Sequence, residues 1–136
     1  MKVENAVQPD PTAIPAFLAV KGEVAMLNLL KFREKAKYED ERETDLSGEA
    51  AYKLYAQGVR KLVEARGGRF AFGAEVVGLL LGEVEEPWDA VAIVVYPSPK
   101  TLIEMATSDD YRTIEVHRAA GLAGQLNLTC REREFG

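Results

Sequence analysis

Hydrophobic residues along this chain follow two spacings, one typical of strands and one typical of helices. The run at 24–32 is apolar on both faces apart from Asn28 and Lys31, and such a strand has to be covered on both sides. Behind Ser47, a good helix-capping residue, apolar side chains recur at helical spacing as far as Arg66. These patterns predict a buried strand followed by the longest helix of the chain.

The second half of the chain also contains strand and helix patterns, but in a different order. Strands are predicted at 69–83, with a kink or bulge at Gly73, and at 88–96, with only the short turn 84–87 between them. Ser98 and Ser108 are placed to cap two successive helical pieces, and a last strand follows at 122–131. A short helix capped by Thr12 precedes the first strand.

The predicted order, after that extra N-terminal helix, is βαββαβ. This order is typical of an α+β, ferredoxin-like fold, in which a four-stranded antiparallel sheet carries helices on one face. A length of 136 residues suits one domain. We expect residues 1–22 to form an extension with the short helix, residues 23–131 to form the core, and residues 132–136 to form a tail.

The connection at 34–46 is the most polar part of the chain and is long for a link between a strand and a helix. Two interpretations stay open at this point. The segment is either a solvated or partly disordered loop, or a lid over a pocket.

Side chains alternate between the two faces of a strand, and this alternation predicts an assembly. Val91, Ile93 and Val95 form a purely apolar face, which we expect to lie under the helices. The opposite face, from Trp88 to Tyr96, is also largely apolar, yet the chain has no second layer of helices to cover it. An uncovered apolar face of this size predicts a two-fold homodimer with its sheets packed face to face.

The predicted dimer also suggests where a ligand would bind. Polar and aromatic side chains share the uncovered side and would line a space at the dimer interface, or between the sheet and the helices. These candidate pocket residues are Asn28, Trp88, Tyr96, Gln125, Asn127 and Thr129. An apolar space with a few converging polar groups is typical of a site for a small apolar or aromatic molecule. The alternative is a non-catalytic interaction or structural module, in which the same residues fill the core and bond one another.

Composition narrows the possible binding partners and the cellular compartment of the protein. The net charge of −5 argues against binding to nucleic acid or to anionic membranes, because both need a basic surface. No apolar run approaches the roughly 20 residues that span a bilayer, and the single cysteine, Cys130, gives no disulfide framework. We therefore expect a cytoplasmic protein.

Several short motifs, taken in order, resemble a known family. They are SGEAAY at 47–52, GGRF at 67–70, Trp88, YPS at 96–98 and SDDY at 108–111, with MLNLLKFR at 26–33 resembling the opening strand of longer members. The chain in this respect resembles domain-of-unknown-function family 1330. The resemblance implies the dimeric α+β-barrel superfamily and brings no settled reaction, substrate or cofactor.

Few residues are candidates for catalysis or metal binding. His117 is the only histidine, which excludes a multi-histidine metal site within one chain. It is a weak candidate for a general base, and the alternative is a partly exposed histidine near a helix end. We expect neither a metal nor a cofactor, and any enzymatic chemistry would be cofactor-independent.

Haem binding is disfavoured by the same resemblance. Some members of the superfamily bind and degrade haem with an asparagine on the first strand, a tryptophan after the third and a helical histidine. Asn28 resembles the first of these elements, but Tyr96 and Glu115 occupy the positions that correspond to the other two.

Overall fold

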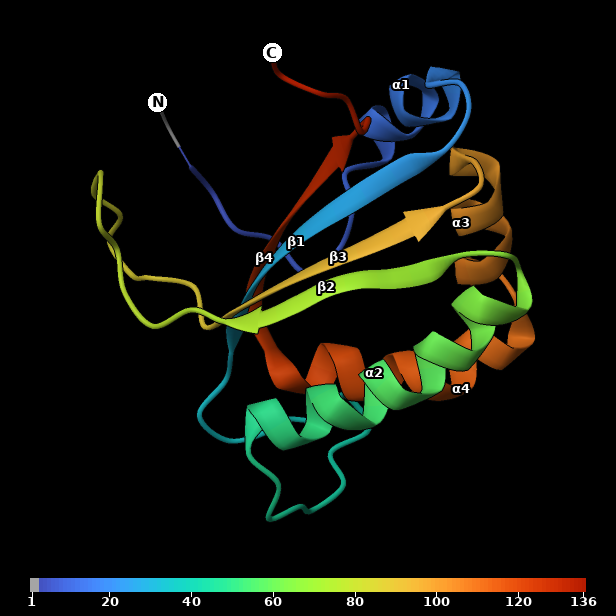
Figure 1. Ribbon diagram of the computed structural model, residues 1–136. Coiled ribbons are helices and arrows are strands. Elements are labelled where there is room, and N and C mark those ends of the chain that lie inside the picture. The colour runs from blue at the N-terminus through green and yellow to red at the C-terminus, as the bar shows by residue number, and fades with distance from the viewer. Residues whose placement is uncertain (1–2) are drawn as a thin grey trace.

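The computed structural model describes residues 3–136 as an antiparallel four-stranded sheet with helices against one face (Figure 1). The strand order is β2-β3-β1-β4. The elements are η1 (Pro11–Ala13), α1 (Ile14–Ala19), β1 (Val24–Phe32), α2 (Gly48–Ala65), β2 (Arg69–Glu75), β3 (Ala90–Tyr96), α3 (Pro99–Ala106), α4 (Asp109–Gly121) and β4 (Leu122–Cys130). The predicted α+β order is confirmed, and residues 1 and 2 of the predicted extension lie outside the described residues.

Side-chain caps begin three of the helices at the positions that the sequence predicts. The hydroxyl of Ser47 accepts a hydrogen bond from the main chain three residues later, and Ser98 and Ser108 do the same at α3 and α4. Such caps satisfy amide groups that the first turn of a helix leaves unpaired. The first helical segment differs from the prediction, because Asp10 caps η1 and accepts a bond from the amide of Thr12.

The second strand is shorter than predicted and its irregularity lies elsewhere. β2 ends at Glu75, and the register shift falls between Phe70 and Phe72 rather than at Gly73. Residues 76–89 form a projecting loop, here called the arm, which is the yellow segment on the left of Figure 1. A hydrogen bond of 2.9 Å from Val76 N to Asp89 O closes its base.

The arm carries the most exposed large apolar side chains in the described chain. Val77 is 89% exposed, Leu80 98% and Leu81 87%. The hydrophobic run that predicted a longer strand therefore has no cover within this protomer. Exposed apolar residues gathered in one place usually mark a contact with another molecule.

The helices cover the opposite face of β3 from the one that the sequence predicted. Val94 and Tyr96 pack with Tyr55 and Val59 of α2 and with Tyr111 of α4 in the main core. The assignment of the Val91, Ile93 and Val95 face to the helices was therefore wrong. Both faces of β3 are apolar, so alternation along this strand alone gave no basis for choosing between them.

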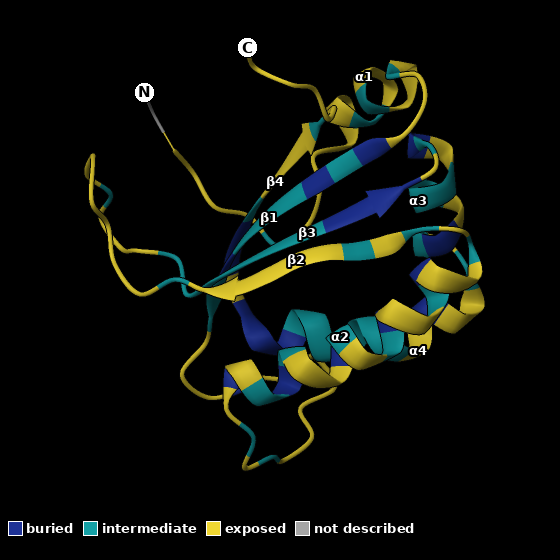
Figure 2. Ribbon diagram, in the orientation of Figure 1, coloured by how far each residue is buried: buried dark blue, intermediate teal, exposed yellow. Residues whose placement is uncertain are grey.

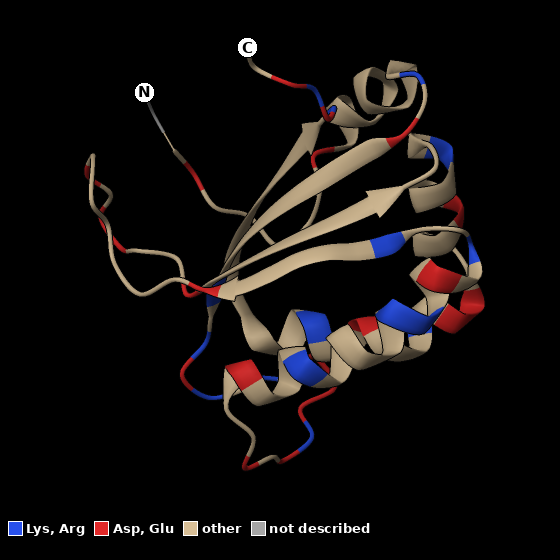
Figure 3. Ribbon diagram, in the orientation of Figure 1, with Lys and Arg blue, Asp and Glu red and all other residues tan. Residues whose placement is uncertain are grey.

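The other side of the sheet remains largely uncovered by helices, and we call it the open face. In register across the strands it carries Phe72, Val91, Ile93, Leu27, Leu29, Leu126 and Leu128. Figure 1 shows α2 and α4 together on the opposite side of the sheet. Figure 2 shows that the two outer strands are more exposed than the inner pair, and Figure 3 shows that charge gathers on the helices and loops. The sheet has an unpartnered apolar side, as predicted. That side is the face of Val91 and Ile93, which the sequence analysis had placed under the helices.

The polar connection at 34–46 is folded against the helices. Ala36 N donates to Leu46 O at 3.0 Å, and Lys37 N donates to Ala120 O at 3.0 Å. Tyr38 is 5% exposed and belongs to a small core with Ala36 and Ala120. The first half of the segment is therefore anchored to the helices, although the side chains of Lys35, Lys37 and Glu39 remain exposed. The packing of one tyrosine anchors a segment whose composition is otherwise polar.

Gly121 lets the end of α4 approach the start of α2. A side-chain carbon at Gly121 would lie 2.5 Å from Gly48 O and 2.9 Å from Tyr52 N, both main-chain atoms. Real β-carbons do not come so close to other atoms. The close approach of α4 and α2 lies beside the last turn of α4, which contains part of the candidate site.

Candidate functional site

A chain of three polar side chains links the sheet to α4 on the helix-covered side. Asn28 Nδ2 donates to the main-chain oxygens of Met26 and Ala92, each at 3.1 Å. Asn28 Oδ1 accepts a bond of 2.7 Å from Gln125 Nε2, and Gln125 Oε1 accepts one of 2.7 Å from Arg118 Nη2. Every donor in this chain points from α4 towards the sheet, so the orientation of both amides is determined by their partners. We call these three residues the polar network.

The register of the sheet creates this network. Asn28 of β1 pairs with Asn127 of β4, and Leu30 pairs with Gln125, so all four residues lie on one face. Gln125 is 8% exposed, whereas Asn127 is exposed at the edge strand. A row of polar groups therefore runs from the interior to the edge of the sheet.

Arg118 brings a positive charge to the network. It is partly buried in the last turn of α4, where a cation is favoured by the helix dipole. Within residues 3–136 no ion pair joins it to a carboxylate. Its hydrogen-bonded partner, Gln125, is neutral, so the network keeps a net positive charge.

Tyrosines of α2 and α4 lie within range of that charge. The hydroxyls of Tyr55 and Tyr111 are 3.0 Å apart, and the ring of Tyr52 lies 5.4 Å from that of Tyr55. Burial raises the pKa of Tyr52 to about 12, against the opposing effect of the Arg118 cation. Burial likewise raises the pKa of Tyr55 and of Tyr111. These hydroxyls stay protonated at neutral pH, so none of them supplies a base or a negative charge.

The structure brings together only part of the predicted pocket. Asn28 and Gln125 are in direct contact, and Asn127 and Thr129 share their face at an exposed edge. Tyr96 lies on the same face but is buried in the main core, paired with Val24 at the far end of β1.

Trp88 lies in the arm and does not join the polar network directly. Its Nε1 donates a 2.8 Å bond to Asn5 Oδ1, in the segment before the first helix, which pairs with the main chain of Gln125 through Ala6. The predicted set therefore divides into a polar group beside α4, one core tyrosine and one tryptophan in the arm.

Arg118 is the residue that sequence reasoning missed. With Ser108 as the cap, Tyr111, Glu115 and Arg118 follow one another at helical spacing and so share one side of α4. That spacing was readable in the sequence. A mostly polar helix, however, gives no apolar stripe from which to tell which side meets the sheet.

His117 faces a different neighbour from Arg118. Its Nδ1 lies 2.7 Å from the hydroxyl of Tyr38, and the two rings meet edge to face. Arg42 stacks over the Tyr38 ring at 4.5 Å and pairs with Asp40. Burial, and then the charge of Arg42, lower the pKa of His117 from its ordinary value. The histidine thus has an orienting partner, but the structure does not join it to the polar network.

This setting predicts the titration of His117. We expect a midpoint below the ordinary 6.5, measured by proton NMR of the only histidine. The substitution Arg42→Gln should raise the midpoint towards 6.5, because it removes the nearby cation, and Arg60→Gln on the surface of α2 should leave it unchanged. Because the folded protein binds this proton more weakly than the unfolded chain, the contribution to stability is complete above pH 6.5. It is lost as the pH falls from 6.5 through the folded pKa, and a midpoint above 6.5 would contradict the assignment.

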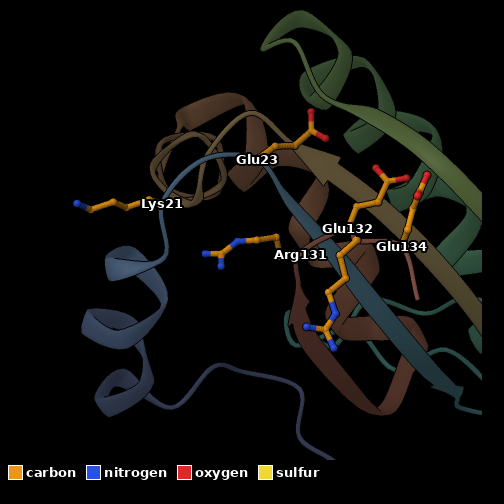
Figure 4. A pocket seen from close by; sticks show the side chains of 6 residues that line it. Lys21, Glu23, Arg131, Glu132 and Glu134 are labelled. Atoms are coloured by element: carbon orange, nitrogen blue, oxygen red, sulfur yellow. The ribbon is translucent and has the colours of Figure 1, made fainter. Parts of the chain in front are cut away.

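The open grooves of the surface are poorer candidates for a ligand site than the polar network. One of about 500 Å³ lies between the turn before β1 and the tail after β4, and Figure 4 shows its charged side chains pointing in different directions. Another, of about 620 Å³, follows the polar segment at 35–45. In residues 3–136 no group of three or more histidine, cysteine or acidic residues is placed to hold a metal ion. The helices in that range are also too short or too polar to cross a membrane.

Comparison with known proteins places the chain in a family. The model of a domain of unknown function, DUF1330, matches residues 42–129. The chain belongs to the DUF1330 family. Among curated proteins none matches it.

Solved structures agree with this placement. The DUF1330 chain is similar to RPA0582, a protein of unknown function from Rhodopseudomonas palustris, with 28% identity over 96% of this chain and 99% of that one, at a TM-score of 0.85. The methylated form of RPA0582 gives 30% identity, coverage of 97% and 98%, and a TM-score of 0.87.

A more distant structure supports the fold alone. A dabb family protein with a ferredoxin-like fold from Mesorhizobium loti is 8% identical, with 84% of this chain and 100% of that chain covered, at a TM-score of 0.52. The predicted family and the predicted ferredoxin-like fold are both confirmed.

Proposed function

We propose that this DUF1330 protein is a homodimer that binds a small apolar or aromatic molecule between its sheet and its helices. The polar network is the observation that supports the ligand site. The buried Gln125 and the partly buried Asn28 and Arg118 meet on the helix-covered side of the sheet, and taking such polar groups out of water costs free energy. The cytoplasm is the proposed compartment, since the chain has one cysteine and an acidic surface.

The open face supports the dimer. Its inner strands present Leu27, Leu29 and Ile93 on the side of the sheet away from α2 and α4. A second copy would offer the same surface, and a two-fold axis lets identical patches cover each other. The arm, with its exposed Leu80 and Leu81, offers more uncovered apolar area where β2 ends and β3 begins.

A structural dimer without a ligand is the second candidate. Asn28 and Gln125 bond each other, and among the described residues every buried side-chain nitrogen or oxygen has a partner. A network that is satisfied internally can serve only to determine how α4 docks on the sheet. The two candidates differ in whether these amides respond to an added molecule.

Light scattering and NMR test the proposal together. We expect a mass twice the 15.0 kDa of the chain, because the open face is covered in the dimer. We also expect saturable shifts of the Asn28 and Gln125 side-chain amides on titration with small aromatic fragments such as indole and phenylacetate. The exposed amide of Gln57 on α2 is the control and should not shift. A 15.0 kDa monomer would contradict the dimer, and unmoved network amides would favour the structural dimer.

A further inference from the structure

We infer that the ligand of the polar network carries a single carboxylate, which Arg118 binds, with an apolar or aromatic body beside it. The inference rests on the proposed ligand site and names the class of molecule that the site accepts, a small organic acid. It concerns residues that neither the family model nor the similar structures assign to any role.

Arg118 has hydrogen-bonding capacity beyond its bond to Gln125. A guanidinium has five N–H groups in a planar fork, and one of them is accounted for by the 2.7 Å bond to Gln125. That bond, continued through Asn28 to two main-chain oxygens, restrains the guanidinium at one of its nitrogens. A fork held in this way is suited to a carboxylate, which accepts two parallel hydrogen bonds.

Arg118 differs in its partner from other arginines of the chain. Four other arginines have acidic partners, namely Arg42, Arg60, Arg69 and Arg112. The chain has 22 acidic residues against 17 basic ones, so acids are abundant. Arg118, which is more buried than these four, nevertheless meets a neutral amide. A partly buried cation without an anion is stabilised when an anionic ligand arrives.

An aromatic cluster on α2 and α4 lies within electrostatic range of Arg118. The rings of Tyr52 and Tyr55 lie 5.4 Å apart, and the hydroxyls of Tyr55 and Tyr111 lie 3.0 Å apart. Burial raises the pKa of all three, so these hydroxyls stay neutral and do not balance the cation. A molecule that joins one acidic group to an apolar body matches both features.

Glu115 favours a carboxylate over a phosphate as the bound anion. It lies one turn before Arg118 on α4, and its charge adds to burial in raising the pKa of Tyr111. A negative charge one helical turn away disfavours a dianion more than a monoanion. Asn127 is exposed opposite Asn28 at the edge strand, on the same face of the sheet as the polar network.

Paired acids and amides test this inference. We would titrate the isotope-labelled full chain with benzoate, phenylacetate and hexanoate, and with the primary amide of each, and follow the Gln125 side-chain amide by NMR. At least one acid is expected to bind about tenfold or more tightly than its own amide, because a hydrogen bond between two charges is stronger than one to a neutral group. In Arg118→Gln this preference should disappear, and Arg118→Lys should keep part of it.

The matched control is Arg112→Gln, an exposed arginine on the same helix, which should keep the full preference. Equal binding of acids and amides, or an undiminished preference in Arg118→Gln, would overturn the carboxylate inference and leave the proposed ligand site standing. No saturable shift with any of the six compounds would overturn both. The ratio between acid and amide is the informative quantity, because a change in folding alone would weaken both members of a pair.

Discussion

Replacing Ile93 by aspartate is expected to turn the protein from a dimer into a folded monomer. Ile93 lies on β3, one of the two inner strands, and is paired with Leu27 of β1 and Phe72 of β2 on the open face. In the proposed dimer its side chain is buried against a second copy. An unpaired carboxylate there loses its hydration without gaining a partner, which costs several kcal/mol per ion. The dimer dissociation constant should rise by more than about a hundredfold.

Light scattering across a range of protein concentrations measures this change, and circular dichroism confirms that the monomer is folded. Leu54→Asp is the matched control, because Leu54 is 42% exposed on α2, in the layer on the other side of the sheet. That variant should remain a dimer. A dimeric Ile93→Asp protein would show that the open face is not the interface.

The substitution Gly121→Ala is expected to destabilise the fold by about 3 kcal/mol. The added carbon would meet Gly48 O at 2.5 Å and Tyr52 N at 2.9 Å, so α4 has to move away from α2 along their whole contact. Neither neighbour is a flexible side chain that could turn aside. Because Arg118 lies one turn earlier, the same shift should also disturb its bond to Gln125.

Urea unfolding at a fixed protein concentration measures the loss, since dimer stability depends on concentration. Gly73→Ala is the matched control. A side-chain carbon at Gly73 would meet nothing within 4 Å, so this variant should be as stable as the parent or slightly more stable. An unchanged midpoint for Gly121→Ala would show that the two helices are not held at this separation.

Local chemistry along the chain was sufficient to predict where the helices begin. Ser47, Ser98 and Ser108 each satisfy amides of their own first turn, and no distant residue takes part. The end of β2 could not be predicted in this way. An apolar run ending in Leu79, Leu80 and Leu81 suggests a buried strand. In the structure the pairing of β2 with β3 ends at Glu75, and these leucines stay exposed.

The candidate site also combines features that the sequence could predict with features that it could not. Alternation along β1 and β4 correctly placed Asn28 and Gln125 on one face, because that depends only on the strand period. Which face the helices cover depends on packing between layers, and both faces of β3 are apolar. The bond from Arg118 depends further on the rotation of α4 about its axis, which its sequence pattern did not determine.

The place of β1 inside the sheet has a consequence for the order in which the molecule can form. β1 is the first strand of the chain and lies between β3 and β4, and Ala25 pairs with both Val95 and Cys130. During synthesis one edge of β1 stays free until β3 has emerged, and the other stays free until nearly the whole chain, including β4, has emerged. Pairing between such distant segments is slow, because a long loop has to close before any contact stabilises it. Since the family match begins at residue 42, a chain cut to the matched residues would also lack this strand, and β3 and β4 would have nothing between them.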